Sequence, residues 1–149
     1  MPSEELMIRR AKSQDADALA QCIDAAYARY QGKITDLPPV SEGCDLEIAT
    51  NQVWVVVRDD KIIAGLVLVA REDEMKLANL AVHPSHGGQG IGRKLIDLAE
   101  REAHRQGYGE ISLNTHVQMP DNIDLYQHLG WRVIMRKDNT VSMRKTITQ

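Results

Sequence analysis

The chain has 149 residues, a net charge of −3 and an aromatic share of 4%, which disfavours nucleic-acid partners because basic surfaces and stacking platforms are hard to build from it. Its hydrophobic share of 43% is ordinary for a soluble globular protein, and we expect one domain over residues 1–149. The first residues do not resemble a signal peptide and no apolar run is long enough to cross a membrane, so we expect a cytoplasmic protein with no membrane partner.

The spacing of apolar residues predicts strands and helices in alternation. In chain order we expect a strand at 6–11, a helix at 13–32, a loop at 33–43, a short helix at 44–51, strands at 53–57, 62–70 and 74–82, a helix at 90–106, a strand at 110–115, a helix at 121–130, and strands at 131–136 and 140–147. Ser13 is the expected N-cap of the first long helix and Gly32 its expected end, while Gly107 is placed to cap the helix at 90–106.

Hairpins on either side of a strand–helix–strand crossover predict an α+β fold. We expect a mixed, mostly antiparallel sheet with helices on both faces. Its parallel pair is expected between residues 75–82 and 110–115, because the helix between them returns the chain to the same end of the sheet.

Neither the cysteines nor the histidines predict a metal site. Cys22 and Cys44 lack the spacing of a zinc signature, and Cys22 lies on the apolar stripe of a predicted helix. His83 and His86 have no third partner nearby in the sequence, so we expect no metal.

The stretch "HPSHGGQGIGRKL" places glycines at 87, 88, 90 and 92 between a strand and a helix. A glycine-rich turn at a helix start exposes N–H groups that bind anions, phosphate above all. Arg93 and Lys94 stand in the first helical turn, where cations are unfavourable unless an anion lies there. The alternative is a tight turn without a ligand.

The glycine spacing narrows the kind of phosphate ligand. A Rossmann motif would need a third glycine at position 93, which is Arg93. The Walker spacing from Gly87 to Gly92 fits better, but Lys94 stands where the metal-binding hydroxyl belongs. A metal-free pyrophosphate therefore fits better than a nucleoside triphosphate.

"LAVHPSHGGQGIG" resembles the signature of the GNAT superfamily of acyl-CoA N-acyltransferases, V-x-P-x-x-[RQ]-G-x-G-x-[GA]. The matching residues are Val82, Pro84, Gly88, Gly90 and Gly92. The chain departs from the signature at Gly87, where the family usually has Arg or Gln. The predicted element order also resembles that of the family along nearly the whole chain.

The resemblance implies that acetyl-CoA is the acyl donor and that the sheet splays at its fourth strand. The expected donor-binding residues are Leu80, Ala81, Val82, Gly87, Gly88, Gln89, Gly90, Ile91, Gly92, Arg93, Lys94 and Asn122. The pyrophosphate would lie on the N–H groups of the turn and the pantetheine along the strand before it. Asn79, polar within an apolar strand, either marks the splay or points to solvent.

"MPDNIDLYQHLGW" resembles the second cofactor segment of the family, with Tyr126, Gly130 and Trp131 as the matching residues. Asn122 lies one helical turn before Tyr126 and hence on the same face. The resemblance implies that Tyr126 is the general acid that protonates the departing thiolate. The alternative is a core tyrosine packed among Ile123, Leu125 and Leu129.

The acceptor is predicted only as a small-molecule amine or a peptide amine. Glu47 and Glu74 are the expected candidates for the base that takes its proton, and both are also ordinary surface carboxylates. The segment from Tyr27 to Glu47 occupies the place where the family usually builds the acceptor pocket, with Tyr27, Tyr30, Asp36, Glu42 and Asp45 among its residues.

Three functions remain open from the sequence. The first is an acetyl-CoA-dependent N-acetyltransferase that acts by direct attack. The second is a catalytically inactive CoA-binding sensor or regulatory module, and the third a nucleotide-binding switch, against which Lys94 argues. A homodimer through residues 140–147 is a further expectation from the family.

Overall fold

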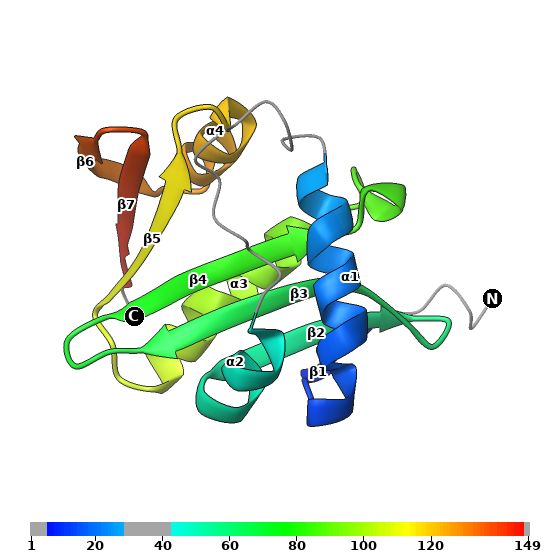
Figure 1. The fold of residues 1–149 in the computed structure, drawn as a ribbon. Helices are drawn as coiled ribbons and strands as arrows, with labels where there is room; N and C mark the ends of the chain where they lie inside the picture. The colour runs from blue at the N-terminus through cyan, green and yellow to red at the C-terminus, as the bar shows by residue number, and fades with distance from the viewer. Residues whose placement is uncertain (1–5, 29–42, 148–149) are drawn as a thin grey trace.

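The computed structural model describes residues 6–28 and 43–147, which form a seven-stranded sheet with helices on both faces (Figure 1). The strand order across the sheet is β1-β2-β3-β4-β5-β7-β6. Every neighbouring pair is antiparallel except β4 and β5, which are parallel. The expected α+β fold is thereby confirmed.

The strands are β1 (Met7–Arg10), β2 (Gln52–Arg58), β3 (Lys61–Ala70), β4 (Met75–Val82), β5 (Glu110–His116), β6 (Arg132–Lys137) and β7 (Thr140–Thr146). The helices are α1 (Ala16–Tyr27), α2 (Cys44–Thr50), α3 (Ile91–Arg105) and α4 (Pro120–His128), with short 3₁₀ turns η2 (Ser13–Asp15) and η4 (Pro84–His86). All of these α-helices and strands lie within a few residues of the predicted ranges.

The start of α1 differs from the prediction. Ser13 opens the 3₁₀ turn η2 and is not the N-cap; Asp15 precedes the helix instead. The Asp15 carboxylate accepts from the Lys12 N–H at 2.7 Å and pairs with Arg9, so a charged group orders the entry to the helix. Gly32, the predicted end, lies outside the described residues.

The sheet separates two apolar clusters. Helix α3 covers one face, and Leu95, Ile96 and Ala99 on its apolar stripe are buried there. Helices α1 and α2 cover the opposite face, where Leu19, Ile23 and Cys44 are buried (Figure 1). Strands β2, β3 and β4 therefore divide their side chains between two cores.

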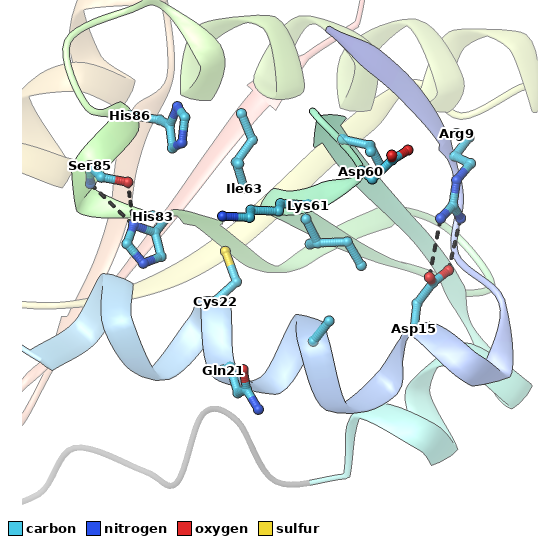
Figure 2. Close-up of a pocket in the computed structure, with 13 residues that line it drawn as sticks. Arg9, Asp15, Gln21, Cys22, Asp60, Lys61, Ile63, His83, Ser85 and His86 are labelled. Carbon is cyan, nitrogen blue, oxygen red and sulfur yellow. Dashed lines mark hydrogen bonds and ion pairs between the residues drawn. The ribbon is translucent and has the colours of Figure 1, made fainter. Parts of the chain in front are cut away.

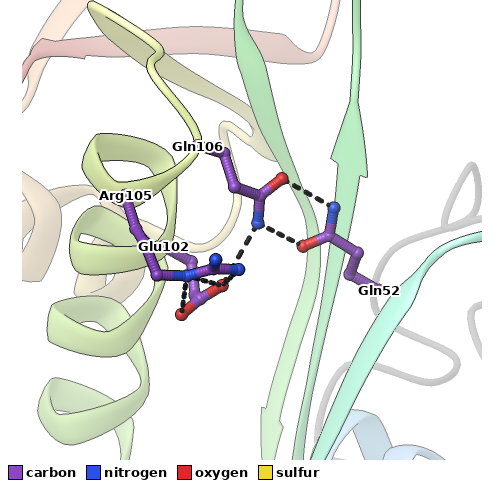
Figure 3. Close-up of polar contacts among 4 residues, drawn as sticks. All are labelled: Gln52, Glu102, Arg105 and Gln106. Atoms are coloured by element: carbon purple, nitrogen blue, oxygen red, sulfur yellow. Dashed lines mark hydrogen bonds and ion pairs between the residues drawn. The ribbon is translucent and has the colours of Figure 1, made fainter.

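The C-terminal end of α3 is fastened to the sheet far from the glycine-rich turn. The side-chain amides of Gln106 and Gln52 donate to each other at 2.7 and 2.9 Å, and Glu102 accepts from Arg105 and Gln106 (Figure 3). Gly107 has a positive φ of 88° and its N–H bonds to His104 O, which confirms it as the predicted cap. This end of α3 is thus fixed relative to β2.

Strands β4 and β5 separate soon after they meet. Their parallel pairing covers only Met75–Leu77 against Ile111–Leu113, much less than the predicted 75–82 against 110–115. From Leu77 on, β4 pairs with β3 alone, and β5 diverges towards α4 (Figure 1). The sheet is splayed at its fourth strand, as the resemblance implies.

A β-bulge in β4 accompanies the splay. Asn79 pairs with Val67 and Leu77 with Leu68, so Ala78 is an extra residue in the strand. Leu80 packs against the α3-side cluster although an unbroken alternation from Leu77 would turn it away. The bulge therefore places Asn79 on the face of α1.

Candidate functional site

The glycine-rich turn joins the end of β4 to the start of α3. Gly88 and Gly90 have positive φ angles of 76° and 77°. A Cβ built on either residue would meet nothing within 4 Å, so backbone conformation, and not lack of room, requires glycine there. The glycines thus form the turn between a strand and a helix that their spacing predicted.

The first turn of α3 presents unbonded N–H groups. Its first helical hydrogen bond runs from Lys94 N–H to Gly90 O at 3.1 Å. The N–H groups of Ile91, Gly92 and Arg93 thus have no acceptor inside the helix. No acidic residue occupies this first turn, and Arg93 and Lys94 are exposed. The geometry is that of an anion site at a helix N-terminus.

A hollow of roughly 490 Å³ lies beside this end of α3. Its lining includes Gly90, Arg93, Lys94, Glu100, Leu129 and Lys145. Lys145 is held there by Glu100 at 2.8 Å and by Leu129 O at 2.8 Å. The lining also includes Asp97, so the hollow has mixed charge, with Arg93 and Lys94 at the end next to the turn.

Arg58 is a neighbour of the turn that the sequence reasoning missed. It ends β2, and its Nη1 donates to Gln89 Oε1 at 2.7 Å and lies 3.2 Å from His86 Nδ1. The Gln89 side chain, expected at the donor, is engaged by this contact. Only the register of the β2–β3 hairpin brings Arg58 here, and no local motif signals that register.

Side chains from three elements meet near the splay. The Tyr27 hydroxyl of α1 donates to Asn79 Oδ1 of β4 at 3.4 Å. Burial raises the pKa of the Tyr126 hydroxyl on α4 well above its ordinary value, and the charge of Tyr27 raises it further. Tyr27 and Tyr126 are therefore close enough to interact electrostatically across the splay.

Tyr126 is a buried residue with 7% of its surface exposed. Its ring lies 5.4 Å from the Trp131 ring, centroid to centroid, and Trp131 Nε1 donates to Glu100 at 3.3 Å. Because its pKa is raised, the phenol stays protonated at neutral pH and its O–H is available as a donor. Tyr126 packs in the core, as its alternative interpretation predicts, while it also borders the splay.

Asn122 lies on the same side of α4 as Tyr126, one turn earlier. It is half-buried, and its Nδ2 donates to Met119 Sδ at 3.6 Å. A bond from an amide to a thioether is weak. The amide is thus readily available for a stronger acceptor.

The two predicted base candidates lie apart. Glu74 precedes β4 at the end opposite to Val82, and it accepts from Ser112 Oγ at 2.8 Å and from Arg144 at 3.4 Å. Met75 and Val82 lie seven residue steps apart along the strand, roughly 23 Å. Glu47 is half-buried on α2, where its charge helps raise the pKa of Cys44. The structure therefore does not bring Glu74 to the glycine-rich turn.

A second hollow, of roughly 550 Å³, lies between α1 and the start of β3 (Figure 2). Arg9 and Asp15 pair across one end at 2.8 Å, and Ser85 bonds to His83 Nδ1 at the other. Cys22 lines it, but burial raises the pKa of its thiol to about 11, so the thiol is not a nucleophile at neutral pH. Four of the polar residues of this hollow are thus paired with one another.

Residues 6–28 and 43–147 contain neither a cluster of metal ligands nor a membrane-spanning helix. No group of three or more His, Cys, Asp or Glu side chains in them is arranged to hold a metal ion. None of their helices is long and apolar enough to span a membrane.

Comparisons with known proteins agree with this geometry. A family model described as the acetyltransferase (GNAT) domain matches residues 49–133, more than half of the chain. The structure is similar to the PaiA N-acetyltransferase of Thermoplasma acidophilum in complex with coenzyme A, with a TM-score of 0.85 and 19% identity over 95% of this chain and 99% of that one. At that identity the likeness shows the fold.

Two curated relatives differ in how much of their length is matched. The chain is 25% identical to the uncharacterized N-acetyltransferase YjgM of Escherichia coli over 86% of this chain and 83% of the relative. It is 31% identical to human N-acetyltransferase 8B over 53% of this chain but only 37% of that relative. The match to the human protein therefore covers only about a third of its length.

Proposed function

The chain belongs to the GNAT family of acetyltransferases, enzymes whose acyl donor is acetyl-CoA, and from this premise we propose that it transfers the acetyl group directly to an amine with Tyr126 as general acid. The observation that carries the proposal is the set of unbonded N–H groups at Ile91–Arg93, beside a strand whose edge is open after Leu77. Such an arrangement suits a donor with a pyrophosphate and an extended arm.

The pyrophosphate would accept hydrogen bonds from the N–H groups between Gly88 and Lys94. Arg93 and Lys94 would supply positive charge to it. The pantetheine arm would run along Leu80, Ala81 and Val82, because β4 has no partner on that side after Leu77. Asn122 would be a further donor contact.

The reaction places charge in two positions. As the amine attacks the thioester carbonyl, negative charge grows on the oxygen, and N–H groups of β4 near Val82 would hold it. When the C–S bond breaks, the electron pair leaves with the sulfur, and the Tyr126 hydroxyl would give that sulfur its proton. The products are the amide and free CoA, with no covalent enzyme intermediate.

The raised pKa of Tyr126 is compatible with this role. A free thiol has an ordinary pKa of about 8.5 and a tyrosine phenol one of about 10. In water the transfer of a proton from the phenol to a thiolate is therefore opposed only by this modest difference in pKa. A thiolate that leaves into the same dry environment is destabilised by the loss of water, which raises its pKa as well. The two groups therefore remain comparable in proton affinity.

The acceptor amine must also lose a proton. Glu74 is already bonded to Ser112 and Arg144 at the far end of β4, so Glu47, directly or through water, remains the prediction for the base. The nature of the acceptor remains open beyond a small-molecule or peptide amine.

Replacing Tyr126 by Phe tests the acid. We expect kcat to fall about a hundredfold, within the usual range for a lost general acid, with CoA affinity retained. The measurement is thiol release from acetyl-CoA with a panel of a free tripeptide, tyramine, aniline and spermidine. Tyr108→Phe is the matched control, because its hydroxyl only donates to Arg71 O at 2.7 Å.

Two outcomes would contradict the proposal. Full turnover by the Tyr126→Phe variant would remove Tyr126 from the acid role. Binding of acetyl-CoA without turnover of any amine would favour a CoA-binding sensor instead of an enzyme.

A further inference from the structure

Arg58 reaches the glycine-rich turn from another part of the sheet. Its Nη1 contacts two side chains of the turn segment, Gln89 at 2.7 Å and His86 at 3.2 Å. Gln89 immediately precedes Gly90, the N-cap of α3. These contacts hold the guanidinium close to the start of that helix, although Arg58 and Gln89 are 31 residues apart in the chain.

The charge of Arg58 has no counter-charge in the part of the chain that the structure describes. No carboxylate there lies within ion-pair distance of it. Within the same residues its Nε is buried without a hydrogen-bond partner. A half-buried cation with neutral partners alone is unfavourable unless an anion completes its surroundings.

The turn beside Arg58 lacks negative charge in the same way. The N–H groups of Ile91, Gly92 and Arg93 point out of the helix start, and the first helical turn holds no acidic residue. Arg58 thus stands next to a site already suited to an anion, and its planar guanidinium matches phosphate oxygens.

We propose that Arg58 is a donor-binding residue whose guanidinium takes the pyrophosphate of the acyl donor as its counter-ion. This inference rests on the proposed function. Gly87 contributes no side chain to the turn, and Arg58 supplies donor groups there from the end of β2.

The test is a calorimetric titration of the full chain with CoA and with 3′-dephospho-CoA. Arg58→Gln removes the charge but can still bond to Gln89, and we expect it to weaken both ligands about ten- to thirtyfold, the effect of one charged hydrogen bond. Arg58→Lys keeps the charge and is expected to lose much less. Thermal unfolding of each variant shows that it remains folded.

Arg101→Gln is the matched control, because it removes the same charge from an exposed position of α3. Arg101 pairs with Asp97 at 3.1 Å, and both side chains are about two-thirds exposed. We expect its affinity for both ligands to equal that of the wild type.

Three results would overturn the assignment. Arg58→Gln could bind CoA as tightly as the wild type. It could weaken CoA alone and not 3′-dephospho-CoA, which would place Arg58 at the 3′-phosphate. Arg58→Lys could lose as much affinity as Arg58→Gln, which would show that the charge of Arg58 does not bind the pyrophosphate. Failure of the proposed function differs from all three, since CoA would then bind with the expected dependence on Arg58 while no amine is acetylated.

Discussion

Gly90 and Gly92 lie two residues apart and are glycine for different reasons. Gly90 has a φ of 77°, which an L-residue adopts only with strain. Gly92 lies inside α3, where a Cβ would make ordinary contacts with Val82 Cγ2 at 3.7 Å and Leu80 Cδ2 at 3.9 Å. The protein itself thus requires glycine at the first position only.

Replacing each of these glycines by alanine separates the two roles. We expect Gly90→Ala to lower the free energy of unfolding by about 1–2 kcal/mol and to weaken CoA several-fold, because the turn must shift. Gly92→Ala keeps the N–H group and the helical conformation, so it should weaken CoA less than Gly90→Ala and raise the free energy of unfolding by up to about 1 kcal/mol through helix propensity. Urea unfolding and calorimetry measure both quantities, and equal effects of the two substitutions would contradict this distinction.

Some features of single residues could be predicted from the sequence, and others could not. Gly88 and Gly90 could be predicted as turn residues because positive φ is a property of glycine itself. The contact of Arg58 with Gln89 could not, since it depends on where a distant hairpin ends. Tyr126 was predicted as the general acid through a resemblance to a family. Its burial and its proximity to Tyr27 depend on how α4 packs, which the sequence does not show.

At the scale of elements, the ion pair between Arg9 and Asp15 joins β1 to the entry of α1. The guanidinium donates to both carboxylate oxygens, at 2.8 and 3.1 Å. This bond is the main cause that lowers the pKa of Asp15 from its ordinary 3.8, against the opposing effect of burial. A lowered folded-state pKa means that the stabilisation is present above pH 3.8 and is lost as the pH falls through the still lower folded value.

Replacing Asp15 by Asn tests this link between β1 and α1. At pH 7 we expect the free energy of unfolding to fall by about 1–3 kcal/mol, since charged hydrogen bonds to a buried carboxylate are lost. The difference from the wild type should shrink as the pH drops below about 4, as urea unfolding at several pH values would measure. Asp97→Asn, which removes an exposed pair with Arg101, is the control with little expected effect. A difference that stays constant down to pH 2 would contradict the linkage.

The splay is the element-scale feature that periodicity alone does not predict. A polar Asn79 in an apolar strand was compatible with an irregularity or with a side chain that points to solvent, and it did not predict the extra residue Ala78 beside it. Strand spacing predicted a parallel pair along the whole of β4, whereas only Met75–Leu77 pairs with β5. The bulge is a property of the register between β3 and β4, which the periodicity of one strand does not contain.

At the scale of the whole molecule, the element order and the mixed sheet could be predicted because the long helices carry a period of 3.6 residues and the strands are short β-rich runs bounded by turn residues. The position of Glu74 relative to the site could not be predicted in this way. Glu74 was expected as a candidate base, yet Ser112 and Arg144 bond to it at the end of β4 that lies far from the glycine-rich turn. Distance along the chain gives no measure of which end of a strand a residue occupies. In the folded protein, packing in the two apolar clusters on either side of the sheet sets the position of each strand.

The most direct test of the account is an NMR titration of ¹⁵N-labelled protein with CoA. We expect the largest amide shifts at Gly88, Gly90, Ile91, Gly92 and Arg93, with the same amides responding to inorganic pyrophosphate alone. Shifts confined to the hollow between α1 and His83, with the amides of the turn unmoved, would contradict the claim that this turn binds the donor.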